Sequence, residues 1–120
     1  MAHHNTVGEA GEQLASQWLA AKGFTILHRN WRAGRDEIDI VARDGDMLVV
    51  VEVKTRSSAR WGAPEWAVGP AKRRSLMRAA AELVHAVPGD PELRFDVVSI
   101  THTPAGPEFL HIPDAFYPTL

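Results

Sequence analysis

Residues 48–55 constrain the fold more than any other part of the chain, because they read LVVVEVKT. A continuous apolar run of this kind is typical of a central strand that is covered on both faces. Since side chains alternate along a strand, Glu52 and Lys54 share one face and emerge together at the end of the buried run. Ionisable groups are costly to bury unless they are paired or bind a metal. The pattern therefore indicates a functional site at the end of a central strand.

The preceding strand repeats the anomaly, with Asp39 between two isoleucines. Residues 44–46, Asp-Gly-Asp, predict a hairpin between this strand and the central one. A two-residue turn at Asp44 and Gly45 places Asp39 diagonal to Glu52, and a four-residue loop places it directly opposite. Both registers put the two carboxylates on one face, whereas a slip of one residue separates them. Facing carboxylates repel each other, and a divalent cation relieves the repulsion.

The other elements follow from hydrophobic spacing and from breaker residues. We expect a helix over 8–22, strands over 24–31, 37–42 and 48–55, a second helix over 70–87, a strand over 93–101 and a short edge strand over 109–112. This order, αβββαβ with a final short strand, predicts one layered α/β domain over residues 1–120, with a mixed central sheet flanked by helices. Residues 1–6 are expected to be flexible and residues 114–120 to form a tail.

Composition limits the chemistry. The chain has no Cys, which excludes disulfides, zinc–thiolate sites and cysteine nucleophiles. The His residues have no metal-ligand spacing, so oxygen ligands are expected at any metal. No apolar stretch reaches the ~20 residues of a membrane helix, and the first residues lack a signal-peptide pattern. We therefore expect a cytoplasmic protein without a membrane partner.

A basic segment stands out against the formal net charge of −2. It carries seven basic residues and one acid, Glu65; the basic residues are Lys54, Arg56, Arg60, Lys72, Arg73, Arg74 and Arg78. A basic face beside an acidic body can attract a polyanion. On the second helix, Arg73, Arg74 and Arg78 are expected to contact phosphates rather than bases.

Several residues leave two interpretations open. Lys72 either reaches toward the active face or is a snorkelling lysine. Glu12 lies at the margin of the first helix's apolar face, where it either joins the site or, like Glu9, stabilises the helix N-terminus. Trp61 and Trp66 either stack on bases, seal a subunit contact or cover the sheet edge. Asp96 is expected in a buried structural ion pair, with a role in the site as the alternative.

The constellation of acids resembles the PD-(D/E)xK nuclease superfamily, and more narrowly the bacterial YraN-like family, which is grouped by fold with archaeal Holliday-junction resolvases. The similarity covers roughly residues 8–113. Its motifs are Gly11-Glu12 followed by Leu-Ala-x-x-Trp-Leu, Lys22-Gly23-Phe24, Arg29-Asn30-Trp31-Arg32, Glu37-Ile38-Asp39-Ile40-Val41, Val51-Glu52-Val53-Lys54-Thr55-Arg56 and Arg94-Phe95-Asp96-Val97-Val98. The resemblance implies a restriction-endonuclease-like core.

Carried over by position, the resemblance implies that Asp39 and Glu52 ligate Mg²⁺ or Mn²⁺, with the Val53 backbone carbonyl as a further ligand. Glu12 would orient water or help to hold a second metal. Lys54 would activate or hold the attacking water and offset charge on the phosphate. These are the oxygen ligands that hard cations prefer.

The implied function is a metal-dependent endonuclease that hydrolyses phosphodiester bonds in DNA, with branched or single-stranded substrates expected. By analogy with junction-cutting relatives of the fold, a homodimer is expected. One departure is Asp36, where relatives commonly have Gly, which adds a fourth nearby acid. The alternative is a non-catalytic nucleic-acid-binding or partner-binding module that retains the nuclease fold. The low net charge favours this alternative, and the intact Asp39, Glu52 and Lys54 favour catalysis.

Overall fold

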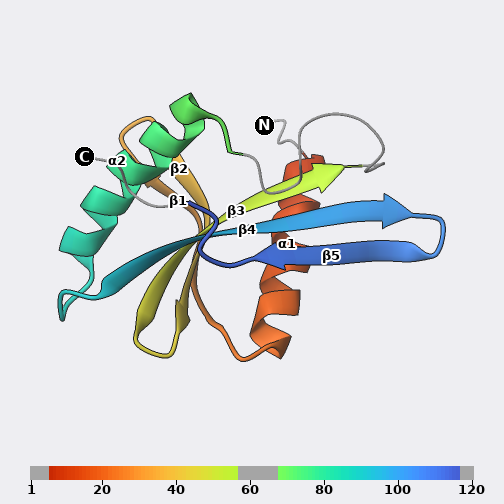
Figure 1. Cartoon of the computed structure of the whole chain (residues 1–120), viewed down its shortest axis with the longest axis horizontal. Helices are drawn as coiled ribbons and strands as arrows, with labels where there is room; N and C mark the ends of the chain where they lie inside the picture. Colours follow the sequence, from red (N-terminus) through yellow and green to blue (C-terminus); the bar gives the residue numbers. More distant parts are fainter. Residues whose placement is uncertain (1–5, 57–67, 117–120) are drawn as a thin grey trace.

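The computed structural model describes residues 6–56 and 68–116, and within them it forms two helices and five strands (Figure 1). The elements are α1 (Thr6–Ala21), β1 (Thr25–Ala33), β2 (Asp36–Asp44), β3 (Met47–Arg56), α2 (Pro70–Ala86), β4 (Glu92–Thr103) and β5 (Gly106–Ile112). The predicted order of elements and the single α/β domain are confirmed. Neither helix of the described part of the chain is long and apolar enough to span a membrane.

The strands form one mixed sheet in the order β1-β2-β3-β4-β5. β3 and β4 are parallel and are joined through α2, while the other neighbours are antiparallel. The predicted central strand is confirmed, because β3 has neighbours on both sides and residues 48–51 are at most 1% exposed. Its apolar run is therefore explained by burial on both faces of the sheet.

A separate hydrophobic core covers each face of the sheet. On one face, α1 contributes Ala15 and Leu19 to a cluster with residues of β2, β3 and β4. On the other face, α2 contributes Leu76, Ala79, Ala80 and Leu83. Most of the stripe that spacing predicts for α2 is buried, and only Val87 is half-buried. On α1, Ala15 and Leu19 are buried, whereas Ala10 and Ala21, which the spacing also places in the apolar stripe, are exposed.

The last strand is longer than predicted, and Figure 1 shows the β4–β5 hairpin running past α1. A proline hides the start of this strand in the sequence. Pro107 lies opposite His102 on the outermost strand, where a missing N–H does not interrupt the sheet. After β5 the chain returns to the α2 core, where Phe116 is 8% exposed and the Ala115 N–H donates to the Phe95 carbonyl at 2.7 Å. Part of the expected tail therefore belongs to the core.

The β2–β3 register decides how the acids meet. The two-residue turn consists of Gly45, with φ of 60°, and Asp46, one position later than predicted. Asp44 instead pairs with Met47, and the ladder continues to Ile40 paired with Val51. Continued by one residue, this register sets Asp39 directly opposite Glu52, which is the second of the two predicted arrangements.

Candidate functional site

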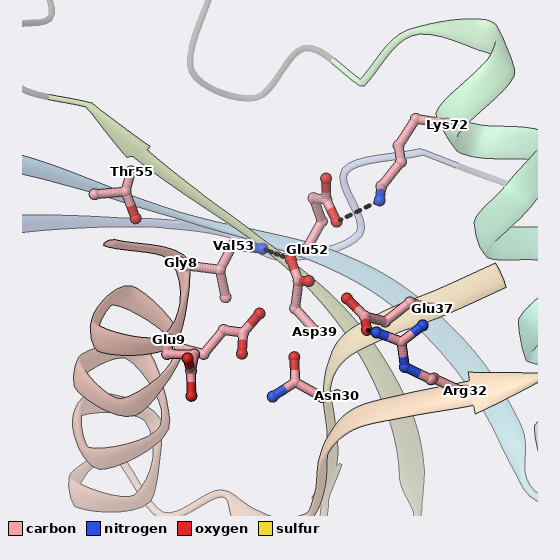
Figure 2. Close-up of a pocket in the computed structure, with 11 residues that line it drawn as sticks. Gly8, Glu9, Asn30, Arg32, Glu37, Asp39, Glu52, Val53, Thr55 and Lys72 are labelled. Atoms are coloured by element: carbon pink, nitrogen blue, oxygen red, sulfur yellow. Dashed lines mark hydrogen bonds and ion pairs between the residues drawn. The ribbon is translucent and has the colours of Figure 1, made fainter. Parts of the chain in front are cut away.

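An open cavity of about 600 Å³ lies at one end of the sheet, beside α1 and the start of α2. Five of its lining residues are acids and two are basic. The lining consists of Gly8, Glu9, Glu12, Asn30, Arg32, Glu37, Asp39, Glu52, Val53, Thr55 and Lys72. Figure 2 shows Asp39 at the centre of this group, with Lys72 reaching from α2 toward Glu52.

Asp39 occupies a break in the alternation of β2. Ile38 packs in the α2-side core, Ile40 packs in the α1-side core, and Val41 returns to the α2 side. A regular strand would put Ile38 and Ile40 on the same face. Asp39 therefore lies where the strand changes face, and its carboxylate is not confined to one side of the sheet.

The Asp39 carboxylate is held by the backbone of β3. Its Oδ2 accepts a hydrogen bond of 2.8 Å from the Val53 backbone N–H. Its carboxylate lies within 4.8 Å of that of Glu12 on α1, and its charge also acts on Glu52 of β3. Asp39 therefore lies near two other acids and raises the pKa values of both.

Glu12 is the most buried acid of the pocket, with 9% of its surface exposed. Its carboxylate oxygen and those of Glu37 and Asp39 lie within 4.8 Å of one another. Burial, and then repulsion from Asp39, raises the pKa of Glu12 to about 7, against a hydrogen bond from Asn30 that lowers it. Glu12 was expected either to join the site or to stabilise the helix N-terminus, and the structure places it in the pocket.

Close packing of α1 on the end of β3 sets the position of Glu12. Gly11, which precedes it, lies against the Thr55 hydroxyl so closely that a Cβ at Gly11 would overlap that oxygen. Only glycine allows the helix to come this near to the strand. Both residues of the Gly-Glu motif on α1 therefore have a reason: Gly11 allows the close contact with Thr55, and Glu12 places an acid in the pocket.

Glu52 reaches the pocket from the opposite face of the sheet. Its side chain is 12% exposed, and its Oε1 has no hydrogen-bond partner among the described residues. The Lys72 ammonium lies 3.7 Å from this oxygen. Burial and repulsion from Asp39 raise the pKa of Glu52 to about 8, although Lys72 and Lys54 lower it. Glu52 therefore holds its proton well above the usual pH range of a glutamate.

Asn30 is a pocket residue that the sequence patterns did not single out. It has φ of 55°, inside β1, and its place between the pairs Arg29–Ile40 and Trp31–Ile38 sets it beside Asp39. Asn tolerates this left-handed conformation better than most residues, and backbone of this kind is often found at functional sites. Its side chain lowers the pKa of Glu12, so Asn30 acts on one of the acids.

Glu37 and Thr55 also line the pocket without having been predicted in it. Glu37 lies two residues before Asp39, and its Oε2 is 2.9 Å from Arg32 Nη2. The strand spacing placed Glu37 on the same face as Asp39, which was a usable signal. Thr55 carried no such signal, because its place depends on the approach of α1.

The predicted lysines and arginines are placed differently from one another. Lys54 does not line the described pocket, although its charge lowers the pKa of Glu52; Arg56 does not line it either. Lys72 does line it. Arg73 is half-buried and Arg74 is exposed on the first turn of α2. Arg60, Trp61 and Trp66 lie outside the described residues.

Arg78 has a structural partner. Its Nη2 and Nε donate to the two carboxylate oxygens of Asp36 at 3.0 and 3.1 Å, and Ser75 Oγ donates to Asp36 at 2.9 Å. These bonds lower the pKa of Asp36 and join the start of β2 to α2. Asp36, expected as a fourth nearby acid, does not line the pocket. Arg78 is thus engaged within the chain.

Asp96 is a buried structural ion pair, as its main interpretation predicted. Arg94 Nη2 and Nε donate to its two oxygens at 2.8 and 2.9 Å, and the Asp114 N–H donates at 2.9 Å. His111 Nε2 lies 2.8 Å from Asp96 Oδ2. Burial raises the pKa of Asp96, but these bonds outweigh burial and hold it below its usual range. Asp96 does not line the acidic pocket.

The predicted metal ligands meet only in part. Asp39 contacts both Glu12 and Glu52, but the tight group of carboxylates contains Glu12, Glu37 and Asp39 and not Glu52. Val53 donates its N–H to Asp39, and since the N–H and C=O of one strand residue point the same way, its carbonyl also faces this side. The arrangement offers oxygen atoms from three elements to a common space.

Comparisons with known proteins all match this chain to one family, and the matched relatives cover nearly its whole length. The model of "Uncharacterised protein family UPF0102" matches residues 11–100. A UPF0102 protein of Anaeromyxobacter dehalogenans is 46% identical over 111 residues, which cover 92% of this chain and 83% of that protein. One of Flavobacterium psychrophilum is 43% identical over 117 residues, covering 98% of each chain. One of Geobacter metallireducens is 45% identical over 115 residues, covering 95% and 94%.

Proposed function

This chain belongs to the uncharacterised protein family UPF0102, and we propose that it is a metal-dependent endonuclease of the PD-(D/E)xK type that hydrolyses phosphodiester bonds in DNA. One observation carries the proposal. Asp39 of β2, which the Val53 N–H holds, lies within 4.8 Å of the carboxylate oxygens of Glu12 and Glu37, and it raises the pKa values of Glu12 and Glu52 in one open pocket. Acids with raised pKa values that gather in a cleft are a recognised mark of an active site.

The donor set fits Mg²⁺ or Mn²⁺. Both cations prefer oxygen ligands, and the oxygens of Glu12, Glu37 and Asp39 lie within 4.8 Å of one another. The orphaned Oε1 of Glu52 provides a further acceptor beside them. When bound, the cation supplies polarisation of a phosphoryl oxygen and acidification of water.

The other steps of the proposed reaction are assigned to residues of the chain. Asp39 and Glu52 would hold the cation, with the Val53 carbonyl as a further donor, and Glu12 would orient the attacking water from α1. Asn30, which lowers the pKa of Glu12, would favour its ionised form. Lys54 adds positive charge beside Glu52 and offsets charge that develops on the phosphate. The open mouth of the pocket suits a polymer better than a small enclosed ligand.

A substrate panel tests this proposal. Linear, flapped, single-stranded and four-way DNA, and matched RNA, are incubated with Mg²⁺, Mn²⁺ or chelator. We expect cleavage of branched or single-stranded DNA with metal and none with chelator. Asp39→Ala serves as the inactive control, so that a contaminating nuclease is recognised. Equal cleavage by wild type and Asp39→Ala, or cleavage in chelator, contradicts the proposal.

The rival function is a non-catalytic module that binds nucleic acid or a partner. The net charge of −2 and the position of Lys54 outside the pocket lining favour it. Binding without cleavage in the same panel, unchanged in Asp39→Ala, is the result that this rival predicts. Gel filtration of the same samples tests the homodimer proposed for a two-fold symmetric substrate.

A further inference from the structure

Two basic side chains line the acidic pocket, and they differ in how firmly they are held. Arg32 Nη2 lies 2.9 Å from Glu37 Oε2, which is a close ion pair. Lys72 Nζ lies 3.7 Å from Glu52 Oε1, which is too long for a hydrogen bond, and the Lys72 side chain is 44% exposed. A lysine with a flexible four-carbon stem can leave such a contact at little cost. Lys72 is therefore the less closely paired cation of the two, although the Arg32 side chain is the more exposed, at 69%.

The position of Lys72 on α2 does not serve the helix. α2 begins at Pro70, its N-cap residue Gly69 makes no side-chain hydrogen bond, and its first turn contains no acid. Cations at the N-terminal end of a helix oppose its macrodipole. Replacement of Lys72 should therefore leave α2 intact. The role of a lysine at this position is to be sought in its contacts outside the helix.

Glu52 is the group on which Lys72 acts. Of the two lysines near Glu52, Lys72 lowers its pKa more than Lys54 does. Lys72, 3.7 Å from Glu52 Oε1, is thus the lysine that acts more strongly on Glu52 in the metal-free protein. A divalent cation that binds Glu52 would lie a few ångströms from the Lys72 ammonium and would repel it.

We infer that Lys72 is an exchangeable cation of the pocket: it lies against Glu52 when no metal is bound, and it moves to a phosphate oxygen of the nucleic acid when a divalent cation takes its place. This inference rests on the proposed function. It assigns to α2, rather than to the β3 lysine alone, the positive charge that meets the substrate.

The exchange predicts that loss of Lys72 strengthens metal binding and weakens metal-dependent binding of nucleic acid. A purely structural role of Lys72 does not predict these opposite effects. Lys72→Met removes the competitor of the metal, so near pH 8.5, above the pKa of Glu52 of about 8, Mn²⁺ alone should bind more tightly, by about three- to tenfold at moderate salt. The same variant should lose most of the Mn²⁺-dependent gain in affinity for a single-stranded oligonucleotide. Phosphorothioate linkages keep the negative charge of that oligonucleotide and resist cleavage during the measurement.

Calorimetry with Mn²⁺ and fluorescence anisotropy with the oligonucleotide measure these two effects. Arg43→Met is the matched control, because it removes one charge at the hairpin end of β2, away from the acidic pocket. Lys72→Arg keeps the charge and should restore both wild-type values. Thermal melts show that each variant is folded.

The outcomes separate this inference from the proposed nuclease. Unchanged or weaker Mn²⁺ binding in Lys72→Met overturns the exchange. The exchange is also overturned if Mn²⁺ raises the affinity for the oligonucleotide equally in wild type and variant, or in neither of them. If no substrate is cleaved but Lys72→Met binds Mn²⁺ more tightly and loses the gain, the nuclease proposal fails and the exchange stands. Absence of Mn²⁺ binding to the wild type overturns both.

Discussion

Gly11 of α1 lies against the Thr55 hydroxyl of β3, with no room between them for a methyl group. We predict that Gly11→Ala lowers stability by roughly 1–3 kcal/mol, the usual range for overpacking. In an ordinary helix the same change would stabilise, so the sign identifies the close approach of helix and strand. Because Glu12 follows Gly11, the variant should also weaken Mn²⁺ binding.

A double-mutant cycle provides the control for this prediction. Thr55→Ala removes the oxygen that the new methyl group would meet, so it should recover most of the stability that Gly11→Ala costs. Urea unfolding of the wild type, both single variants and the double variant measures the coupling. Additive effects of the two substitutions would show that the contact does not position α1.

The second prediction concerns Asp39→Asn, which removes a charge and keeps the shape of the side chain. Since Asp39 raises the pKa values of both Glu12 and Glu52 by repulsion, the metal-free variant should be as stable as the wild type or more stable. Mn²⁺ should raise the Tm of the wild type, with a gain of about 2.7 kcal/mol at a hundredfold excess over Kd. The variant should show little or no gain. Equal metal-induced shifts at constant ionic strength would remove Asp39 from the metal site.

The third prediction is the pH dependence of the metal-free protein. Glu12 and Glu52 have folded-state pKa values of about 7 and about 8, above the ordinary value of 4.5. Between pH 4.5 and 8 the folded state therefore binds more protons than the unfolded state, so stability falls as pH rises, by at most about 1.4 kcal/mol per pH unit for each group. Melts in chelator from pH 5 to pH 9 measure this slope. In Glu52→Gln the decline should end near pH 7 rather than pH 8, and an unchanged curve would contradict the raised pKa of Glu52.

The fourth prediction follows from the proposed chemistry. Asp39→Ala and Glu52→Ala should abolish cleavage, and Lys54→Ala should reduce it by roughly 10²–10⁴-fold if this lysine positions a transferred proton. Single-turnover rates at matched metal occupancy give the comparison. Wild-type rates in Lys54→Ala would agree with its position outside the pocket lining and would leave Lys72 as the effective cation.

The fifth prediction separates the arginines of α2. Replacement of Arg73 and Arg74 together should flatten the salt dependence of DNA binding, by about 0.9 in slope for each phosphate that the helix no longer binds. Replacement of Arg78 should instead lower the Tm, because it breaks the bidentate interaction with Asp36. Binding isotherms at several salt concentrations and thermal melts distinguish the two effects. A flattened slope in Arg78→Ala without loss of stability would reverse this assignment.

The sequence predicted what depends on burial and periodicity. The helices were found because their apolar residues recur with the helical period, and the central strand was found because its apolar run is continuous. Asp39, Glu52 and Glu12 were found because acids at the margins of buried stripes are costly and therefore informative. The same reasoning gave the default interpretation of Asp96, which the structure shows in an ion pair.

The features that the sequence did not predict depend on departures from regular geometry or on contacts between distant elements. The change of face at Asp39 and the left-handed backbone of Asn30 break the alternation on which strand predictions rely. The partner of Arg78 is an acid on a distant strand, and a solvent-facing position on a helix does not reveal it. The grouping of Glu37 with Glu12 required the distance between α1 and β2, which no local pattern contains.

The two hydrophobic cores lie on opposite sides of the sheet, and the acidic pocket draws on elements from both of them. Glu12 belongs to the helix of one core, whereas Glu52 and Lys72 contact each other on the side of the other. A cation held between Glu12, Asp39 and Glu52 would act as a cross-link through the edge of the sheet. The two layers would then open together rather than separately, and amide hydrogen exchange in α1 and in α2 would slow in step as the metal is added.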